Sequence, residues 1–157
     1  MQLDTLTRPA LILPDLKASD RATVLRLLAE GIVDAGALDD ANALYRKLDE
    51  RESLGSTGIG GGVAIPHCKV DGLDDVVLAV GMTRNRDVGV DFDAVDGQPV
   101  HLFFVIVSPA KAPAAHLQCL AAISKWVKTP GNVDAVLALD EPDAIYARLQ
   151  ASFAESS

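Results

Sequence analysis

The chain has 157 residues, of which 49% are hydrophobic and 23% charged, and it carries a net charge of −8 with a pI near 4.7. This length and composition predict one globular domain that buries its own core. The acidic balance excludes a general affinity for nucleic acid or anionic membranes, because phosphate groups are bound by lysine and arginine.

Helical periodicity comes first along the chain. Between residues 20 and 32, leucine, alanine and isoleucine recur at i, i+3, i+4 and i+7, one face of a helix that Gly36 would end. The same spacing predicts a second helix from Asp40 to a point between Arg51 and Leu54. We therefore expect two helices before the first clear strand signal.

Three strand candidates follow: VAIPH at 63–67, DVVLAVGMT at 75–83 and VHLFFVIVS at 100–108. A third helix is predicted from about Ala114 to Lys128, and the tail 133–153 contains one or two more, with Pro142 in a first turn. This order predicts an α/β fold in which a mixed β-sheet is sandwiched between helices, in a single domain over residues 1–157.

No segment predicts export or membrane insertion. The N-terminal MQLDTLTRPA lacks the basic segment and apolar core of a secretory signal. The longest apolar run, at 100–107, is far shorter than the ~20 residues of a membrane span. The two cysteines do not form a secreted disulfide framework. We expect a cytoplasmic protein.

The stretch RESLGSTGIGGGVAIPHCKV, at 51–70, is the least ordinary part of the sequence. It holds five glycines within residues 55–62. A P-loop would require a lysine after the glycines, and a dinucleotide fingerprint would lie between a strand and a helix, whereas this loop lies between a helix and a strand. Glycines still permit close approach of another molecule, although a simple flexible connector is the alternative.

His67 follows this loop directly, behind Pro66. Imidazole is a nucleophile that is largely neutral near pH 7, and proline restricts the adjacent backbone. A purely structural histidine is the alternative, but Arg51 precedes the loop near a helix end and His116 opens a later helix, whose N-terminus attracts anions. Two imidazoles, one arginine and a helix N-terminus together predict a receptor for a transferring phosphoryl group.

The motifs LGSTGIGGGVAIPH with RE before it, FDAVDGQPVHLFFVIVSP and HLQCLAAISK resemble the IIA component of the phosphoenolpyruvate-dependent sugar phosphotransferase system, of the fructose and mannitol type. The GSTGIG…AIPH wording is most similar to the nitrogen-regulatory IIA branch. The resemblance covers about residues 11–149, which it implies as the core of a single type-2 EIIA domain. The resemblance implies an α/β sandwich in which His67 takes a phosphoryl group from the phosphocarrier protein HPr or its nitrogen-branch equivalent. In sugar-transporting members the group passes to a cysteine of a IIB domain.

Arg51 and His116 stand where the family has an arginine and a second histidine. Chemically, Arg51 supplies charge to the equatorial phosphoryl oxygens. Backbone N–H groups of the loop are expected to add donors, and the residues concerned are Gly55, Ser56, Thr57, Gly58 and Gly60. The scheme uses no metal and no cofactor.

Three functions stay open at this stage. The first is a phosphocarrier in a relay, and the second is a regulatory module whose phosphorylation state selects its targets without onward transfer. The third, a metal- or cysteine-dependent hydrolase, uses His67, Cys68, His116 and Cys119, but no H-x-x-x-H or C-x-x-C spacing supports it.

One residue departs from the family pattern, because Cys68 stands where relatives usually have glycine. Either a small side chain is tolerated there or the thiol is a redox switch on His67. Cys119 is expected in the core and His101 in a structural role. Asp93 and Asp96 are expected in turns.

Overall fold

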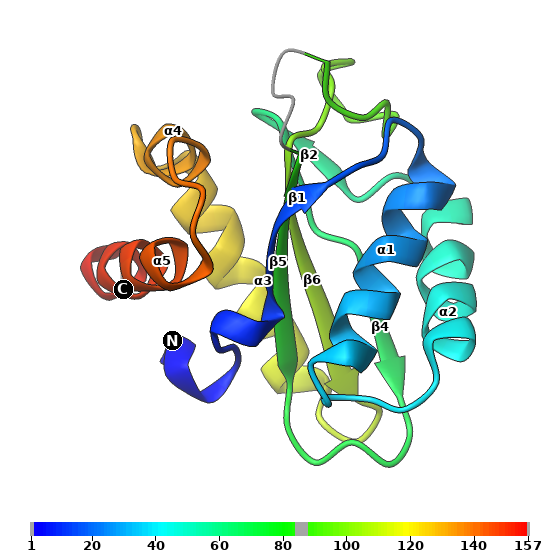
Figure 1. The fold of residues 1–157 in the computed structure, drawn as a ribbon. Coiled ribbons are helices and arrows are strands. Elements are labelled where there is room, and N and C mark those ends of the chain that lie inside the picture. The colour runs from blue at the N-terminus through cyan, green and yellow to red at the C-terminus, as the bar shows by residue number, and fades with distance from the viewer. Residues whose placement is uncertain (1, 84–87, 157) are drawn as a thin grey trace.

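The computed structural model describes residues 2–83 and 88–156. The short helical turns η1 (Leu3–Thr5) and η2 (Pro9–Leu11) lead into strand β1 (Ile12–Leu16). Helices α1 (Arg21–Asp34) and α2 (Ala41–Ser53) precede strands β2 (Gly58–Gly60), β3 (Val63–Ala64), β4 (His67–Val70), β5 (Val77–Thr83) and β6 (Leu102–Pro109). Helices α3 (Pro113–Lys128), α4 (Asn132–Leu137) and α5 (Pro142–Ser156) complete the fold (Figure 1).

The predicted helices are confirmed, and two of them begin where aspartate caps the backbone. Asp20 accepts a hydrogen bond from the Thr23 N–H at 2.8 Å, and Asp40 accepts one from the Ala43 N–H at 3.0 Å. A side-chain oxygen at this position satisfies an amide group that the first turn leaves unpaired. Gly36, after α1, has φ of 84°, a left-handed conformation that ends a helix easily when the residue is glycine.

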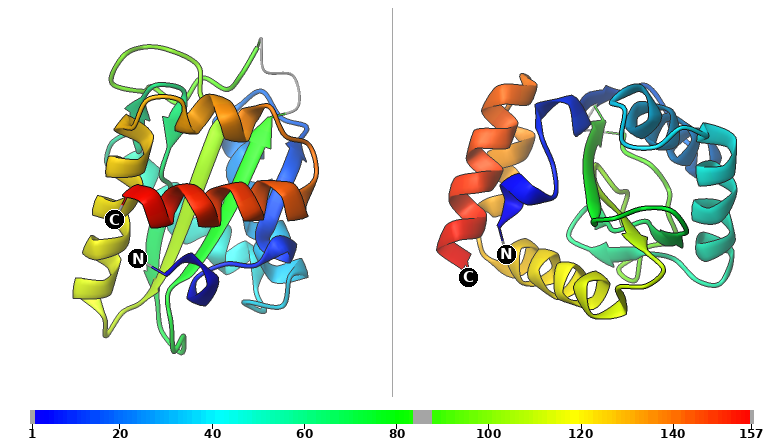
Figure 2. Two further views of the ribbon diagram at one scale, coloured as in Figure 1. Left: turned by 90° about the vertical axis from the view of Figure 1, so that its left-hand side faces the viewer. Right: turned by 90° about the horizontal axis from the view of Figure 1, so that it is seen from below.

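The described strands form one six-stranded mixed sheet in the order β1-β5-β6-β3-β2, with β4 also paired to β6. β1 is parallel to β5, and β5 is antiparallel to β6. β3 and β4 both run parallel to β6 along the same edge. Figure 2 shows α1 and α2 on one face and α3, α4 and α5 on the other, so the predicted sandwich of helices around a mixed sheet is confirmed.

The strand prediction needs two additions and one correction. The sequence analysis did not identify β1 or β2. The segment 63–67, expected as one strand, is split into β3 and β4 at Ile65 and Pro66. The chain nevertheless stays alongside β6, because the Pro66 carbonyl accepts a hydrogen bond from the Ile106 N–H at 3.0 Å. Proline lacks the N–H that a continuous ladder uses.

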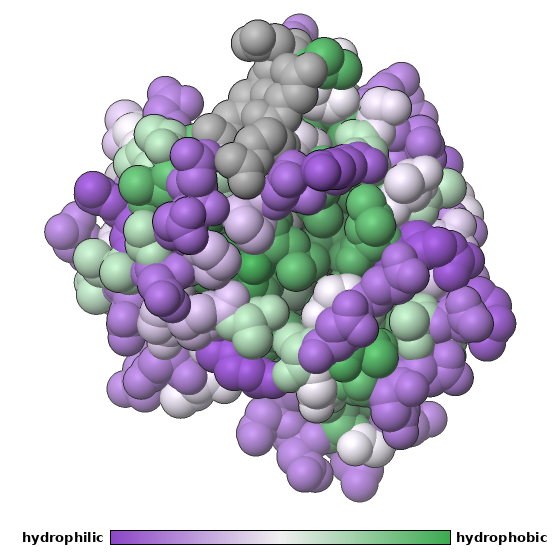
Figure 3. Space-filling view, viewed as in Figure 1, coloured by the Kyte–Doolittle hydropathy of each residue, from purple (hydrophilic) through white to green (hydrophobic). Residues whose placement is uncertain are grey.

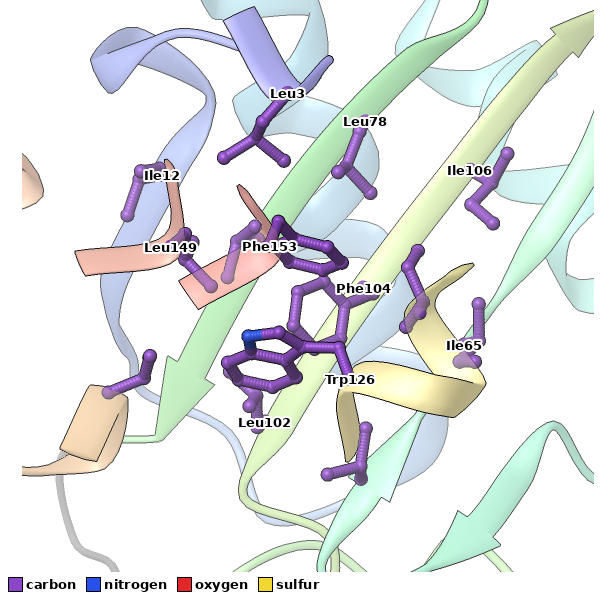
Figure 4. Close-up of a cluster of buried hydrophobic side chains, with 14 of the residues drawn as sticks. Leu3, Ile12, Ile65, Leu78, Leu102, Phe104, Ile106, Trp126, Leu149 and Phe153 are labelled. Carbon is purple, nitrogen blue, oxygen red and sulfur yellow. The ribbon is translucent and has the colours of Figure 1, made fainter. Parts of the chain in front are cut away.

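Each face of the sheet carries its own hydrophobic cluster, since successive strand residues point to opposite faces. On one face, Phe104 packs edge-on against Trp126 at 5.3 Å between ring centroids, and Trp126 stacks on Phe153 at 5.3 Å (Figure 4). On the other face, Phe92 and Phe103 pack against the residues of α1 and α2. The two layers hold β4, and with it His67, in a fixed position between α2 and α3.

Candidate active site

His67 is the first residue of β4, and its ring orientation is set by the backbone just before it. Nδ1 lies 2.7 Å from the carbonyl oxygen of Ile65. A carbonyl oxygen only accepts, so Nδ1 carries the proton and donates it. The lone pair is then on Nε2. His67 is therefore presented as a neutral imidazole with a defined nucleophilic nitrogen.

Arg51, in the last turn of α2, lies beside that nitrogen. Its Nε donates to Nε2 of His67 at 3.3 Å, which agrees with the lone pair on Nε2. Its Nη1 donates to the carbonyl oxygen of Gly55 at 2.8 Å. The second bond fixes the guanidinium plane, so a permanent positive charge is held next to the nucleophile.

His116 lies in the first turn of α3 and closes the other side of the site. Its ring centroid is 5.2 Å from that of His67, with the planes 60° apart. The side chain is buried, and Nδ1 pairs with the Ser108 hydroxyl at 2.6 Å. His116 is thus a buried residue, which α3 and β6 bring to His67 across 49 positions of sequence.

The environment keeps both imidazoles uncharged. Burial lowers the pKa of His67 below 6.5, and the positive charges of Arg51 and Lys69 lower it further. Burial, followed by the neighbouring His67 and Lys69, lowers the pKa of His116 from 6.5 to about 4. At pH 7 both rings are therefore neutral, because burial and the positive charges nearby oppose their protonation. A neutral His67 keeps the lone pair on Nε2 that a nitrogen nucleophile needs.

An open pocket of about 420 Å³ contains these groups. Three cationic residues line it, Lys47, Arg51 and Lys69, against one carboxylate, that of Glu50. The protein as a whole has a net charge of −8. The pocket is thus a local positive region in an acidic protein, and positive side chains stabilise the charge that builds up on a phosphoryl group during transfer.

The glycine loop is hydrogen-bonded to Arg51 and to the backbone just before His67. Gly55 binds Arg51 through its carbonyl, and the Thr57 carbonyl accepts from the Ile65 N–H at 3.0 Å. Ser56 bonds through its hydroxyl to the Phe92 carbonyl and the Gly58 N–H. Among the described residues that line the pocket, none of the five predicted loop residues occurs. Direct contact between the loop and a phosphoryl group stays a prediction.

Two residues of the site were not proposed from the sequence. Glu52, directly after Arg51, has a buried carboxylate that accepts from both the N–H and the hydroxyl of Thr57. Ser108, at the end of β6, is fully buried and pairs with His116. The available signals were the RE pair before the loop and a single serine that ends an otherwise apolar strand.

The cysteines are poorly suited to chemistry. Both are free and buried, and burial raises the pKa of Cys68 and of Cys119 to about 12. The nucleophilic and metal-binding form of cysteine is the thiolate, which such a pKa disfavours. Over residues 2–83 and 88–156, no three histidine, cysteine, aspartate or glutamate side chains gather in a way that could hold a metal ion. The hydrolase alternative therefore has no supporting geometry in the described chain.

The remaining expectations concern structural residues. Cys119 belongs to the core cluster beneath α3, as expected. Asp96 accepts from the N–H groups of Gly61 and Gln98, which confirms its role in a turn. Asp93 adopts φ of 50°, a left-handed conformation that aspartate tolerates in turns. His101 lies 3.4 Å from the Thr83 hydroxyl, outside the pocket of His67.

A larger hollow, of about 670 Å³, lies between β1 and α1. On this face, Figure 3 shows hydrophobic residues in a depression bordered by hydrophilic ones. Its described lining is mainly apolar, with Leu13, Leu27 and Val33 among others, and includes no histidine or cysteine. Size alone would select this hollow, whereas the chemistry of the side chains selects the pocket at His67.

No helix in the described part of the chain is both long enough and apolar enough to cross a membrane.

The whole chain is also similar to known proteins. Residues 5–152 match the family model described as "Phosphoenolpyruvate-dependent sugar phosphotransferase system, EIIA 2". The chain is 33% identical to a nitrogen regulatory protein of Pseudomonas aeruginosa over 146 residues, which is 93% of each chain. It is 36% identical to the fructose-specific EIIA component of Haloferax volcanii over 123 residues, 78% of each chain.

The fold is also similar to that of a solved relative. The crystal structure of the nitrogen regulatory protein IIA-Ntr from Neisseria meningitidis superposes with a TM-score of 0.85 at 26% identity, covering 95% of this chain and 99% of that one. The family model, the curated relatives and this fold point to the same conclusion: the chain belongs to the type-2 EIIA family of the phosphoenolpyruvate-dependent sugar phosphotransferase system, whose members carry phosphoryl groups.

Proposed function

We propose that this protein accepts a phosphoryl group on Nε2 of His67, with HPr or its nitrogen-branch equivalent as donor. The observation that carries the proposal is the orientation of the ring. Nδ1 is held by the Ile65 carbonyl, and Nε2 points to Arg51 in an open, positively charged pocket. A histidine with only a structural role does not require an unprotonated Nε2 that faces a cation in an open pocket.

In the transfer step, Nε2 attacks phosphorus in line, and the P–N bond to the donor histidine breaks as the new P–N bond forms. The Nδ1 proton stays on His67, shared with the Ile65 carbonyl, so the phosphorylated ring remains neutral. Arg51 meets the charge on the equatorial oxygens. In this scheme the Ser108 hydroxyl donates to Nδ1 of His116, which leaves the Nε2–H of His116 for a phosphoryl oxygen.

The surface around the pocket favours a protein as donor. Leu54, which lines the pocket, is 85% exposed, and Leu117, next to His116 in sequence, is 65% exposed. Exposed apolar side chains at the rim of a site are typical of a docking surface.

The fate of the phosphoryl group separates two candidate functions. In the first, His67 passes the group to a cysteine of a IIB domain in a sugar-transport relay; the similarity to a fructose-specific EIIA component supports this function. In the second, phosphorylation of His67 changes which target proteins the chain binds, without onward transfer. The match to the Pseudomonas aeruginosa nitrogen regulatory protein covers 93% of each chain and the match to the fructose-specific component 78%, which favours the regulatory function. Discharge of the phosphorylated chain by purified IIB domains decides between them.

The test of the acceptor is direct. Incubation with phosphoenolpyruvate, enzyme I and HPr, from both the sugar and the nitrogen branch, should add one phosphoryl group that is labile in acid and stable in alkali. Such lability is typical of a phosphoramidate, because protonation of the ring makes it a better leaving group. Mass spectrometry should place the group on His67. His67→Ala should keep a native circular dichroism spectrum and accept none.

A matched control is His101→Ala, which removes a histidine outside the pocket and should accept the group at the wild-type rate. Label that is stable in acid, that maps to Ser56 or Thr57, or that persists in His67→Ala would show that the phosphohistidine mechanism is wrong for this protein.

A further inference from the structure

The buried carboxylate of Glu52 is not explained by the transfer step itself. Glu52 follows Arg51 in α2, yet its side chain turns inward and only 2% of the residue is exposed. Its Oε2 accepts from the Thr57 N–H at 3.1 Å, and its Oε1 accepts from the Thr57 hydroxyl. Both oxygens are therefore used to hold one residue of the glycine loop.

Thr57 links this carboxylate to the nucleophile through two further hydrogen bonds. The Thr57 carbonyl accepts from the Ile65 N–H at 3.0 Å. The Ile65 carbonyl in turn accepts from Nδ1 of His67 at 2.7 Å. Position and direction of that last carbonyl determine which ring nitrogen carries the proton. Hydrogen bonds through Thr57 and Ile65 thus connect Glu52 to Nδ1 of His67, the atom whose protonation defines the tautomer.

A carboxylate is not expected at a buried position where the side chain only fills space. Burial raises the pKa of Glu52, and the two Thr57 bonds and the charges of Arg51 and Arg21 only oppose that shift. A buried ionised group costs folding free energy that an apolar side chain of similar volume would not cost. Such a cost is expected where a rigid functional group must be supported.

We propose that Glu52 is a positioning residue for phosphoryl transfer: it fixes Thr57 and Ile65 so that His67 keeps its proton on Nδ1 and presents Nε2 to the donor. This inference rests on the proposed function of His67. Glu52 is not among the described residues that line the pocket, so it acts through the backbone of the loop and not through contact with the reacting atoms.

The first test compares Glu52→Ala with Glu52→Gln. Alanine leaves both Thr57 donors without a partner, and we expect phosphoryl acceptance from HPr to fall by about tenfold or more, since small misplacements of a reacting group have effects of this order. Glutamine keeps the shape: its amide oxygen accepts from the Thr57 N–H and its amide nitrogen donates to the hydroxyl. Glu52→Gln should therefore restore most of the wild-type rate.

The second readout is independent of phosphorylation. Nitrogen-15 NMR of the histidine rings at pH 8, where both imidazoles of the site are neutral, should show wild-type His67 protonated on Nδ1 alone. In Glu52→Ala a second tautomer, protonated on Nε2, should appear. Ser152→Ala is the matched control, because it removes a buried hydrogen bond to Trp126 on the far side of the sheet and should lower stability without changing the tautomer.

If folded Glu52→Ala keeps both the wild-type rate and a single tautomer, the inference is wrong. If Glu52→Ala does not fold, Thr57→Val decides, since it removes only the hydroxyl bond: a lower rate with a mixed tautomer supports the inference, and no change in either overturns it. Failure of the wild-type protein to accept a phosphoryl group on His67 would contradict the proposed function instead, and the tautomer comparison would still test the role of Glu52.

Discussion

Removal of the Arg51 charge provides the sharpest quantitative test of the site. Nε of the Arg51 guanidinium lies 3.3 Å from Nε2 of His67, the atom that would become bonded to phosphorus under the proposed function, so a phosphoryl oxygen would lie at about 4 Å from the charge. With an effective dielectric of about 20, one such pair of charges is worth about 4 kcal/mol. Since about 1.4 kcal/mol changes a rate tenfold, this corresponds to an upper limit of about a thousandfold.

The pocket is open, so solvent screening reduces the effect, and we expect Arg51→Ala to slow phosphoryl acceptance by about tenfold to a hundredfold. The rate of Arg51→Lys should lie between those of the wild-type protein and Arg51→Ala. An ammonium group keeps the charge but cannot bind His67 and Gly55 together in the geometry of the guanidinium. The assay is single-turnover transfer from purified phosphorylated HPr, with circular dichroism to verify the fold.

The measurement must separate two effects of the arginine. Its charge also lowers the pKa of His67, so Arg51→Ala raises that pKa and increases the fraction of protonated, unreactive ring at low pH. At pH 8 this fraction is negligible in both proteins, and the remaining difference reports stabilisation of the transferring group. A rate of Arg51→Ala at pH 8 within twofold of the wild-type rate would refute the reasoning.

Three further predictions concern the same region. The pKa of His116 is about 4 in the folded protein and 6.5 in the unfolded chain, so between these pH values the unfolded chain binds a proton that the folded protein does not. The free energy of unfolding should therefore be highest above about pH 6.5 and fall by up to about 3 kcal/mol as the pH falls toward 4. Urea unfolding at a series of pH values should show this loss, and it should be smaller in His116→Gln. Cys68→Ala should accept the phosphoryl group at nearly the wild-type rate, and Cys68 should resist alkylation in the folded protein, because burial raises its thiol pKa to about 12; rapid alkylation or loss of transfer would revive the redox hypothesis. Finally, transfer from purified phosphorylated HPr should be unaffected by a chelator, since arginine and histidine supply the charge and the donors, whereas chelator-sensitive transfer would point to a metal.

Local sequence determined much of the secondary structure of this protein. Asp20 and Asp40 cap helices whose apolar period is visible in the sequence, and these helices lie within a few residues of the predicted bounds. The apolar run at 100–108 became the central strand β6, buried along its whole length. Such features depend on neighbours within a few positions, so a single sequence contains the information.

The sequence also predicted the residues of the candidate site, but not their arrangement. β1 was missed because Pro14 lies in its middle and its residues do not alternate between apolar and polar, and proline is tolerated there since β1 is an edge strand. The split at Pro66, the choice of Nδ1 as the protonated nitrogen and the pairing of Ser108 with His116 depend on carbonyls and side chains that β6, α2 and α3 bring together from distant positions. The sequence therefore predicted which groups belong to the candidate site, and tertiary structure determined which nitrogen of His67 keeps its lone pair, because a hydrogen bond from Nδ1 to the Ile65 carbonyl fixes the tautomer.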